Sequence, residues 1–128
     1  MVAFLDRSED AHSWARAALT EVKGNFITTS AVITEAMHFI APIPSGPEAL
    51  SAFVDLGPVQ IFDFCQPVEL RRAVARMGRY ADAPMDFADA TLVLLAEATG
   101  TGDILTLDRR GFTFYRWGKN RAFNLLGS

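Results

Sequence analysis

Residues 84–112 read PMDFADATLVLLAEATGTGDILTLDRRGF, a stretch that contains two apolar runs separated by glycines. Its first half is an apolar run long enough for a buried helix, with Asp86 and Asp89 in the first turn. After two glycines, DILTL (103–107) has the length and composition of a buried strand, and Asp108 follows it directly. Carboxylates therefore stand at the ends of two buried elements, where they act either as caps and turn residues or as parts of a site.

The remaining sequence repeats this alternation of helices and short strands. Helical spacing of apolar residues, with capping residues and glycine or proline stops, predicts helices at 9–22, 29–40, 48–56, 67–81 and 86–99. Apolar runs bounded by turn residues predict strands at 25–28, 59–64, 103–107 and 112–116. Strands that alternate with helices indicate an α/β fold with a mostly parallel central sheet flanked by helices. No linker divides the chain, so residues 1–128 are expected to form one domain.

The composition restricts the class of protein. Hydrophobic residues make up 50% of the 128 residues and charged residues 21%, which supports a packed core and argues against disorder. No apolar run has the length of a membrane span and no signal segment opens the chain, so we expect a cytoplasmic protein without membrane contact. The single Cys65 excludes an internal disulfide and a multi-cysteine zinc site, and its apolar neighbours predict a core position.

Charge is distributed unevenly along the chain. The net charge is −3, yet residues 71–128 hold nine of the 12 Lys and Arg residues and only six of the 15 acids. These cations precede and follow the stretch quoted above: Arg71, Arg72, Arg76, Arg79, Arg109, Arg110, Arg116, Lys119 and Arg121. A solvated face accounts for such a pattern, and so does a basic rim around an acidic site that cuts phosphodiesters.

Acids from separate segments are expected at one edge of the sheet, because the working crevice of open α/β sheets lies outside the carboxyl ends of the strands. Asp108 follows a strand directly, while Asp86 and Asp89 share one face at the start of a helix. Glu35 lies two turns into the helix that follows another strand, and among apolar neighbours an unpartnered carboxylate would be costly. Capping explains Asp86 equally well. His38, one turn beyond Glu35, is expected to be a histidine at the edge of the core rather than a ligand.

The chemistry of such a group of acids points to a metal ion. Crowded carboxylates raise one another's pKa unless a cation lies among them. Oxygen ligands without cysteine or histidine select a hard divalent cation such as Mg²⁺ or Mn²⁺.

Three segments carry a family resemblance: FITTSAVITEA, PMDFADATLVLLAE and ILTLDRRGFTFYR. In the order and spacing of their acids they resemble PIN domains, specifically the VapC-type toxins of bacterial toxin–antitoxin pairs. The resemblance extends from the first residues to about Leu126. It implies a three-layer PIN-like fold and a metal-dependent ribonuclease. It also implies a VapB-like antitoxin as partner, RNA as substrate, and a homodimer.

The resemblance assigns roles to individual residues. Glu35, Asp89 and Asp108 match the acidic metal-binding positions of the family, and Asp86 matches a frequent accessory acid. Thr106 lies where the family often keeps a hydroxyl beside the site. The cleavage products implied carry 5′-phosphate and 3′-hydroxyl ends.

One family feature has no match. PIN domains open with a central strand that ends in an aspartate, whereas MVAFLDRSEDAH resembles the segment that follows it. We therefore expect that strand and its aspartate upstream of Met1, with Asp6, at the end of VAFLD, as the alternative. The departure leaves two other functions open. One is a catalytically impaired PIN-fold protein that binds RNA or an antitoxin without cleavage. The other is a receiver-like phosphoacceptor domain, which would need paired acids after a first strand.

Overall fold

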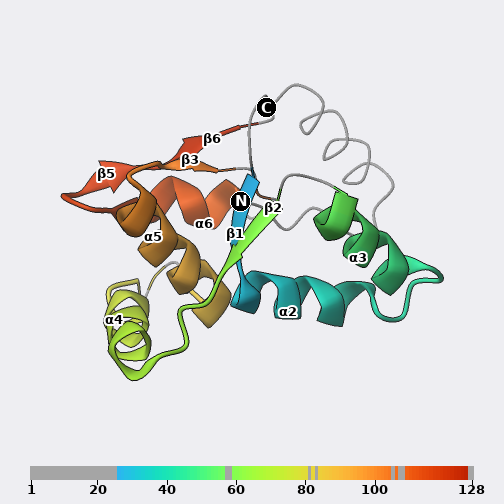
Figure 1. Cartoon of the computed structure of the whole chain (residues 1–128). Coiled ribbons are helices and arrows are strands. Elements are labelled where there is room, and N and C mark those ends of the chain that lie inside the picture. Colours follow the sequence, from blue (N-terminus) through green and yellow to red (C-terminus); the bar gives the residue numbers. More distant parts are fainter. Residues whose placement is uncertain are drawn as a thin grey trace.

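The computed structural model describes residues 26–56, 59–80, 82, 84–104, 106 and 109–126 (Figure 1). The predicted helix at 9–22 and the candidate Asp6 lie outside these ranges. The helices are α2 (Ser30–Ile40), α3 (Gly46–Leu56), α4 (Pro67–Met77), α5 (Phe87–Thr99) and α6 (Arg109–Phe114). The strands are β1 (Phe26–Thr29), β2 (Val59–Phe62), β3 (Asp103–Ile104), β4 (Arg116–Trp117), β5 (Arg121–Ala122) and β6 (Asn124–Leu125).

The strands pair in three separate two-stranded sheets within the described residues. Strands β1 and β2 are parallel, with Phe26 opposite Val59 and Thr29 opposite Phe62, and α2 and α3 form the crossover between them. Strands β3 and β6 are also parallel, while β4 and β5 form an antiparallel hairpin. The expected α/β composition with parallel strand pairs is thus present. One continuous sheet between two helical layers stays a prediction.

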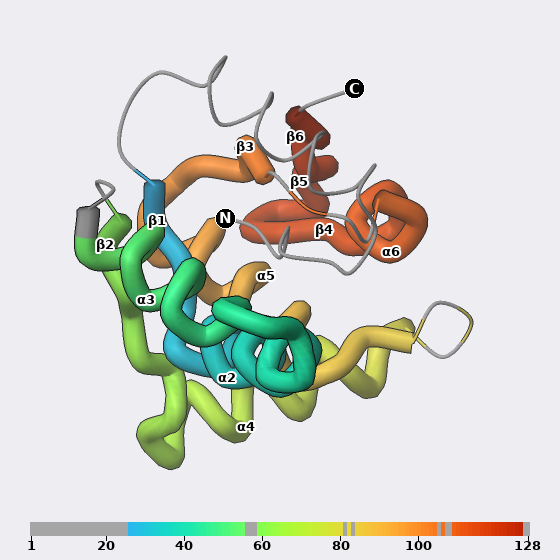
Figure 2. Tube along the Cα trace, turned by 90° about the vertical axis from the view of Figure 1, so that its right-hand side faces the viewer, coloured from blue at the N-terminus to red at the C-terminus, as the bar shows by residue number. Residues whose placement is uncertain are grey.

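Helix α5 forms the centre of the core. Its residues Ala88 and Ala90–Ala96 are all buried, and the helix packs against β1, α2, α4 and β4. Figure 2 shows α5 enclosed by these elements. A helix that is apolar on all faces is buried on all sides. The long apolar run in the sequence of α5 is therefore explained by its central position in the core. In the part of the chain that the structure describes, no helix has the length and apolar character needed to cross a membrane.

An aromatic cluster attaches α6 and the C-terminal strands to this core. The ring of Phe112 lies edge-on to Tyr115 and to Phe123, with centroid distances of 5.0 and 5.1 Å. Tyr80, which follows α4, meets Tyr115 edge-on at 5.0 Å, and its hydroxyl accepts a 2.9 Å hydrogen bond from the Arg116 amide. Edge-to-face contacts of this kind contribute beyond simple area burial. They fix the segment after β3 against α4 and α5.

The predicted strand at 112–116 is wrong, because residues 109–114 form α6. Phe112 and Tyr115 lie three residues apart and are both 1% exposed, so a helical turn brings them to the same side. Phe114, between them, is 56% exposed. The local pattern of aromatic residues is typical of a strand, but the packing of Phe112 and Tyr115 into the aromatic cluster outweighs it.

Two predicted core positions are also wrong. Cys65 is exposed, because β2 ends at Phe62 and the neighbouring Phe64 takes the buried position. His38 is exposed at the end of α2, where its ring meets Phe39 at 6.0 Å. Helix α4 ends at Met77 rather than at residue 81, because Gly78 follows it as the C-cap.

Candidate functional site

The start of α2 is held against α5 by two buried threonines. Thr29 is the N-cap of α2, and its hydroxyl accepts a 3.2 Å hydrogen bond from the Val32 amide. The same hydroxyl lies 2.8 Å from the hydroxyl of Thr91 in α5, and both residues are fully buried. The Thr91 hydroxyl also lies 2.6 Å from the carbonyl oxygen of Ala88, to which it donates. Thr29 therefore donates to Thr91, and this hydrogen bond joins α2, which carries Glu35, to α5, which carries Asp89.

Asp86 and Asp89 form a reciprocal capping box at the start of α5. The Asp89 amide donates to the Asp86 carboxylate at 2.8 Å, and the Asp86 amide donates to the Asp89 carboxylate at 3.3 Å. The capping interpretation of Asp86 is confirmed. Asp86 is exposed, whereas Asp89 is half-buried and lies two residues before Thr91. The box fixes the position of the Asp89 carboxylate at the end of α5 that adjoins α2.

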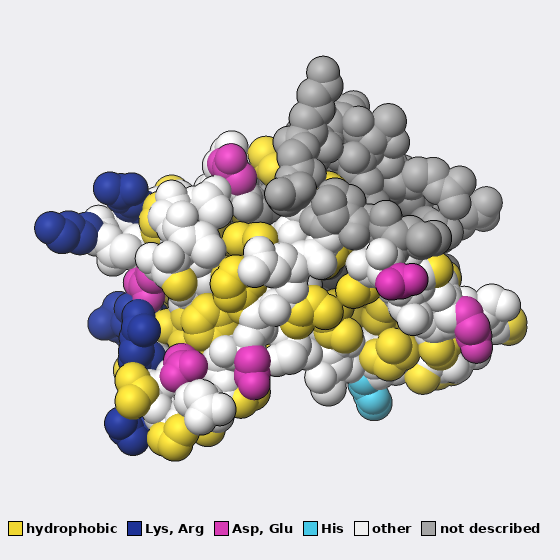
Figure 3. All heavy atoms as spheres, in the orientation of Figure 1, with side chains coloured by type: hydrophobic (Ala, Val, Ile, Leu, Met, Phe, Trp, Pro, Cys, Tyr) yellow, Lys and Arg dark blue, Asp and Glu magenta, His cyan; other side chains and the backbone are white. Residues whose placement is uncertain are grey.

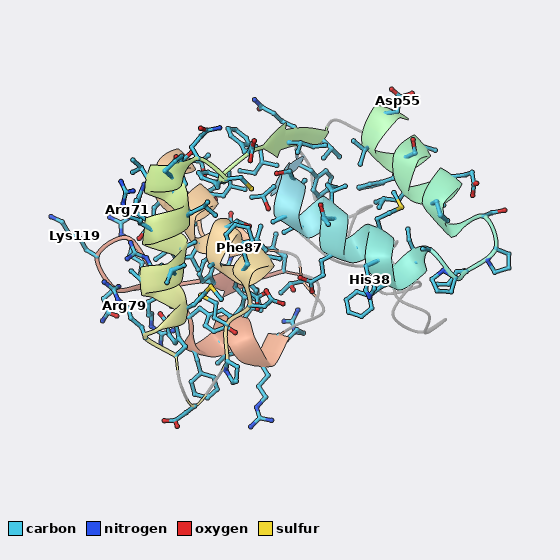
Figure 4. The ribbon with its side chains drawn as sticks, turned by 90° about the horizontal axis from the view of Figure 1, so that it is seen from below. His38, Asp55, Arg71, Arg79, Phe87 and Lys119 are labelled. Carbon is cyan, nitrogen blue, oxygen red and sulfur yellow. The ribbon has the colours of Figure 1, made fainter. Side chains whose placement is uncertain are left out.

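Glu35 lies on the side of α2 that packs toward α5. It follows Ala31 and Val32 by one helical turn, and both of these residues pack in the core that α5 dominates. Glu35 itself is half-buried. Figure 4 looks at this end of the molecule from below and shows Phe87, the first residue of α5, between α2 and α4. The segments that carry Glu35 and Asp89 thus come from neighbouring helices.

The third predicted ligand, Asp108, lies outside the described residues, so its position relative to Glu35 and Asp89 is a prediction. Thr106, two residues earlier, is 4% exposed. Among the residues that the structure describes, no group of three or more His, Cys, Asp or Glu side chains is arranged to hold a metal ion. The predicted donors are all carboxylate oxygens, and this donor chemistry fits Mg²⁺ or Mn²⁺.

The predicted basic rim divides into cations with structural contacts and cations open to solvent. Arg76 binds Glu97 through two 2.8 Å hydrogen bonds, and Arg109 donates to the Leu126 carbonyl at 2.8 Å. Arg116 donates to three carbonyl oxygens at the end of α6. Five exposed cations lie on α4, just after it, and on the β4–β5 hairpin. This set, the basic face, consists of Arg71, Arg72, Arg79, Lys119 and Arg121. Arg110 is also exposed but belongs to α6 and is not part of this set. Figure 3 shows Lys and Arg side chains gathered at this end of the molecule.

Two residues of structural importance to this region escaped the sequence analysis. Thr91 is a single hydroxyl-bearing residue within the apolar run of α5, and this isolated polar side chain could have indicated a buried hydrogen bond. Glu97 is the last acid of α5, and its contacts with Arg76 join segments that are far apart in the sequence. Neither contact has a local sequence signature.

No family model matches the chain. The chain is 26% identical over 117 residues to Ribonuclease VapC26 of Mycobacterium tuberculosis, a match that covers 91% of this chain and 87% of that protein. This chain is similar to a VapC ribonuclease over most of its length. The similarity supports, at low identity, the VapC-type resemblance of the three segments that contain Glu35, Asp89 and Asp108.

Proposed function

We propose that this protein is a VapC-like endoribonuclease that hydrolyses RNA phosphodiester bonds with Mg²⁺ or Mn²⁺. Two findings support the proposal together. The chain is similar to Ribonuclease VapC26 over 91% of its length. The helices that carry Glu35 and Asp89 are joined at their starts by the buried hydrogen bond between Thr29 and Thr91. This hydrogen bond is the observation that carries the proposal, because it holds the starts of the helices that carry Glu35 and Asp89 against each other.

In the proposed mechanism the acids act as ligands and the protein fixes their positions. Glu35, Asp89 and Asp108 would hold the cation, which would supply positive charge to polarise the phosphate and to lower the pKa of a water. The Asp89 carboxylate is oriented by the hydrogen bond that it accepts from the Asp86 amide, so it needs little reorganisation to bind. Asp86 holds the first turn of α5 and therefore acts on Asp89 through the backbone. Exposed arginines position the RNA backbone without reading its sequence.

The similarity to a VapC protein also carries proposals about partners. A VapB-like antitoxin would bind the protein and oppose its activity, and two copies would form a homodimer. We propose that the protein acts in the cytoplasm.

Cleavage of a fluorescently labelled single-stranded RNA tests the function. We expect cleavage in the presence of Mg²⁺ or Mn²⁺ and none with EDTA. Asp89→Asn and Asp108→Asn should each abolish cleavage while the far-UV circular dichroism spectrum stays unchanged, because asparagine keeps the shape but not the charge of the ligand. Asp82→Asn, a change at an exposed acid outside the predicted site, serves as the matched control.

Retained activity in Asp89→Asn and Asp108→Asn would refute the assigned site. RNA binding without any metal-dependent cleavage would instead favour the alternative of a PIN-fold protein that binds RNA or an antitoxin without cutting. Both outcomes are read from the same samples, since binding and cleavage are measured separately.

A further inference from the structure

The basic face brings together cations from two segments that are distant in the sequence. Arg71 and Arg72 lie on α4 and Arg79 directly after it, whereas Lys119 and Arg121 belong to the β4–β5 hairpin. Figure 4 shows Arg71, Arg79 and Lys119 on the same side of the molecule, with His38 and Asp55 at the opposite end. All five side chains are exposed.

A single carboxylate holds the two segments in place. Glu97 of α5 accepts two 2.8 Å hydrogen bonds from Arg76 of α4 and one 2.9 Å hydrogen bond from the Gly118 amide of the hairpin. The side chains of Glu97 and Arg76 are only 12% and 17% exposed. Charge-assisted hydrogen bonds of this kind are the stronger ones, and here both come from Nη2 of Arg76. The spacing between the α4 cations and the hairpin cations is therefore fixed by the fold.

The backbone turn and the aromatic ring of the β4–β5 hairpin determine how Lys119 and Arg121 are exposed. Gly118 and Asn120 adopt positive φ angles of 56° and 61°, which form a tight turn with Lys119 at its tip. The Arg121 guanidinium lies over the Trp117 ring at 5.2 Å from its centroid, a contact that limits its rotamers while leaving its nitrogen atoms accessible to an anion.

The charge of this face differs from that of the whole protein. The chain carries a net charge of −3, yet the basic face gathers five positive charges. Of the acids on or near these elements, Glu69 on α4 is partly buried, Glu97 is engaged by Arg76, and Asp82, three residues after Arg79, is exposed. Arg72 lies 3.5 Å from Glu97 but remains 51% exposed. Like charges held together by the fold repel each other, and a bound polyanion relieves that repulsion.

We propose that the basic face binds the phosphate backbone of single-stranded RNA and so guides it along α4 and the hairpin. The inference rests on the proposed function, since it names the surface by which that same substrate is held. The contacts are to phosphates and not to base edges, so the face binds without sequence preference. A group of guanidinium and ammonium cations on fixed elements fits the anionic backbone of a nucleic acid better than scattered carboxylates of a protein partner.

Fluorescence anisotropy with a labelled single-stranded RNA tests the proposal, with EDTA present so that metal-dependent cleavage does not occur. Each phosphate contact contributes about −0.7 to the slope of log K against log salt for single strands. Five contacts therefore predict a slope of about −3.5, and Arg71→Gln/Lys119→Gln should reduce its magnitude by about 1.4. At 0.1 M salt this corresponds to a loss of affinity of about 25-fold, because the two lines converge near 1 M.

The matched control is Ser51→Glu/Ala52→Glu, which lowers the net charge by the same two units on the exposed side of α3. We expect the slope of log K against log salt for this variant to differ from that of the parent protein by no more than about half of the contribution of one phosphate contact. Equal losses in both double variants, or an unchanged slope in Arg71→Gln/Lys119→Gln, would overturn the proposal. A poly-glutamate peptide that bound as tightly as RNA of equal charge, with the same sensitivity to Arg71→Gln/Lys119→Gln, would assign the face to an acidic protein instead. Absence of metal-dependent cleavage in a chain that shows the expected slopes would refute the nuclease function and leave this surface intact.

Discussion

The Thr29 and Thr91 hydroxyls lie 2.8 Å apart in a region where both side chains have no solvent exposure. Thr29 caps α2 and Thr91 belongs to the second turn of α5, so this single hydrogen bond sets the distance between the helices that carry Glu35 and Asp89. A buried hydroxyl that loses its partner loses hydrogen bonding without regaining water. The two threonines therefore help to position the helices that carry Glu35 and Asp89, although neither threonine is a proposed ligand.

Replacement of Thr91 tests this relationship. Thr91→Val keeps the shape of the side chain but removes the acceptor for Thr29, and we expect the free energy of unfolding to fall by about 1–2 kcal/mol. Urea denaturation monitored by circular dichroism measures the change. Thr99→Val is the matched control, because the Thr99 hydroxyl donates only to the Leu95 carbonyl within α5, and its loss should cost less than about 0.5 kcal/mol. Equal losses in the two variants would show that the contact between helices contributes nothing specific.

The capping box at the start of α5 supports a second prediction. Asp86→Ala removes the acceptor of the Asp89 amide and should lower the free energy of unfolding by about 1 kcal/mol. Asp86→Asn should cost only a few tenths, because asparagine is an equally good N-cap. If the two variants were equally destabilised, the negative charge rather than the hydrogen bond would be the stabilising feature. Thermal or urea unfolding of the three proteins separates these cases.

Helix α5 shows how much of the fold could be predicted from the sequence. Its apolar run, its N-cap at Asp86 and its C-cap at Gly100 are local features, and the observed bounds differ from the prediction by one residue at the start. Helix α6 could not be predicted in the same way, because Phe112 and Tyr115 become helical neighbours only through their contacts with distant rings such as Phe123. Local preference decides an element only where tertiary contacts agree with it.

The candidate site also has features that could be predicted from the sequence and features that could not. The residue types and their placement at strand ends and helix starts were visible in the sequence. The Thr29–Thr91 hydrogen bond joins residues 62 positions apart, and no local sequence pattern predicts it. The contact of Glu97 with Arg76 and with the hairpin amide likewise depends on how α4 and the hairpin pack against α5.

Glu97 carries the third prediction. Glu97→Gln weakens the paired hydrogen bonds to Arg76 in a mostly buried position and should lower the free energy of unfolding by about 2 kcal/mol. Glu69→Gln, on the same side of the molecule but without a described ion pair, should change it by less than about 0.5 kcal/mol. A double-mutant cycle with Arg76→Met isolates the pair, and we expect a coupling energy of at least about 1 kcal/mol. Additive effects of the two substitutions would contradict a direct interaction.

The exposed Cys65 gives a prediction about pH. The hydrogen bond of its thiol to Asp63 raises the pKa of Cys65, with smaller contributions in the same direction from desolvation and from the charges of Asp63 and Glu69. The thiolate is the reactive form, so a raised pKa lowers the rate of alkylation at pH 8 and moves the rise of the rate to higher pH. Asp63→Asn should move the rate profile with iodoacetamide to lower pH and make the reaction at pH 8 faster. Asp55→Asn, an exposed acid on α3, should leave the profile in place, and a profile unchanged by Asp63→Asn would refute the assigned cause.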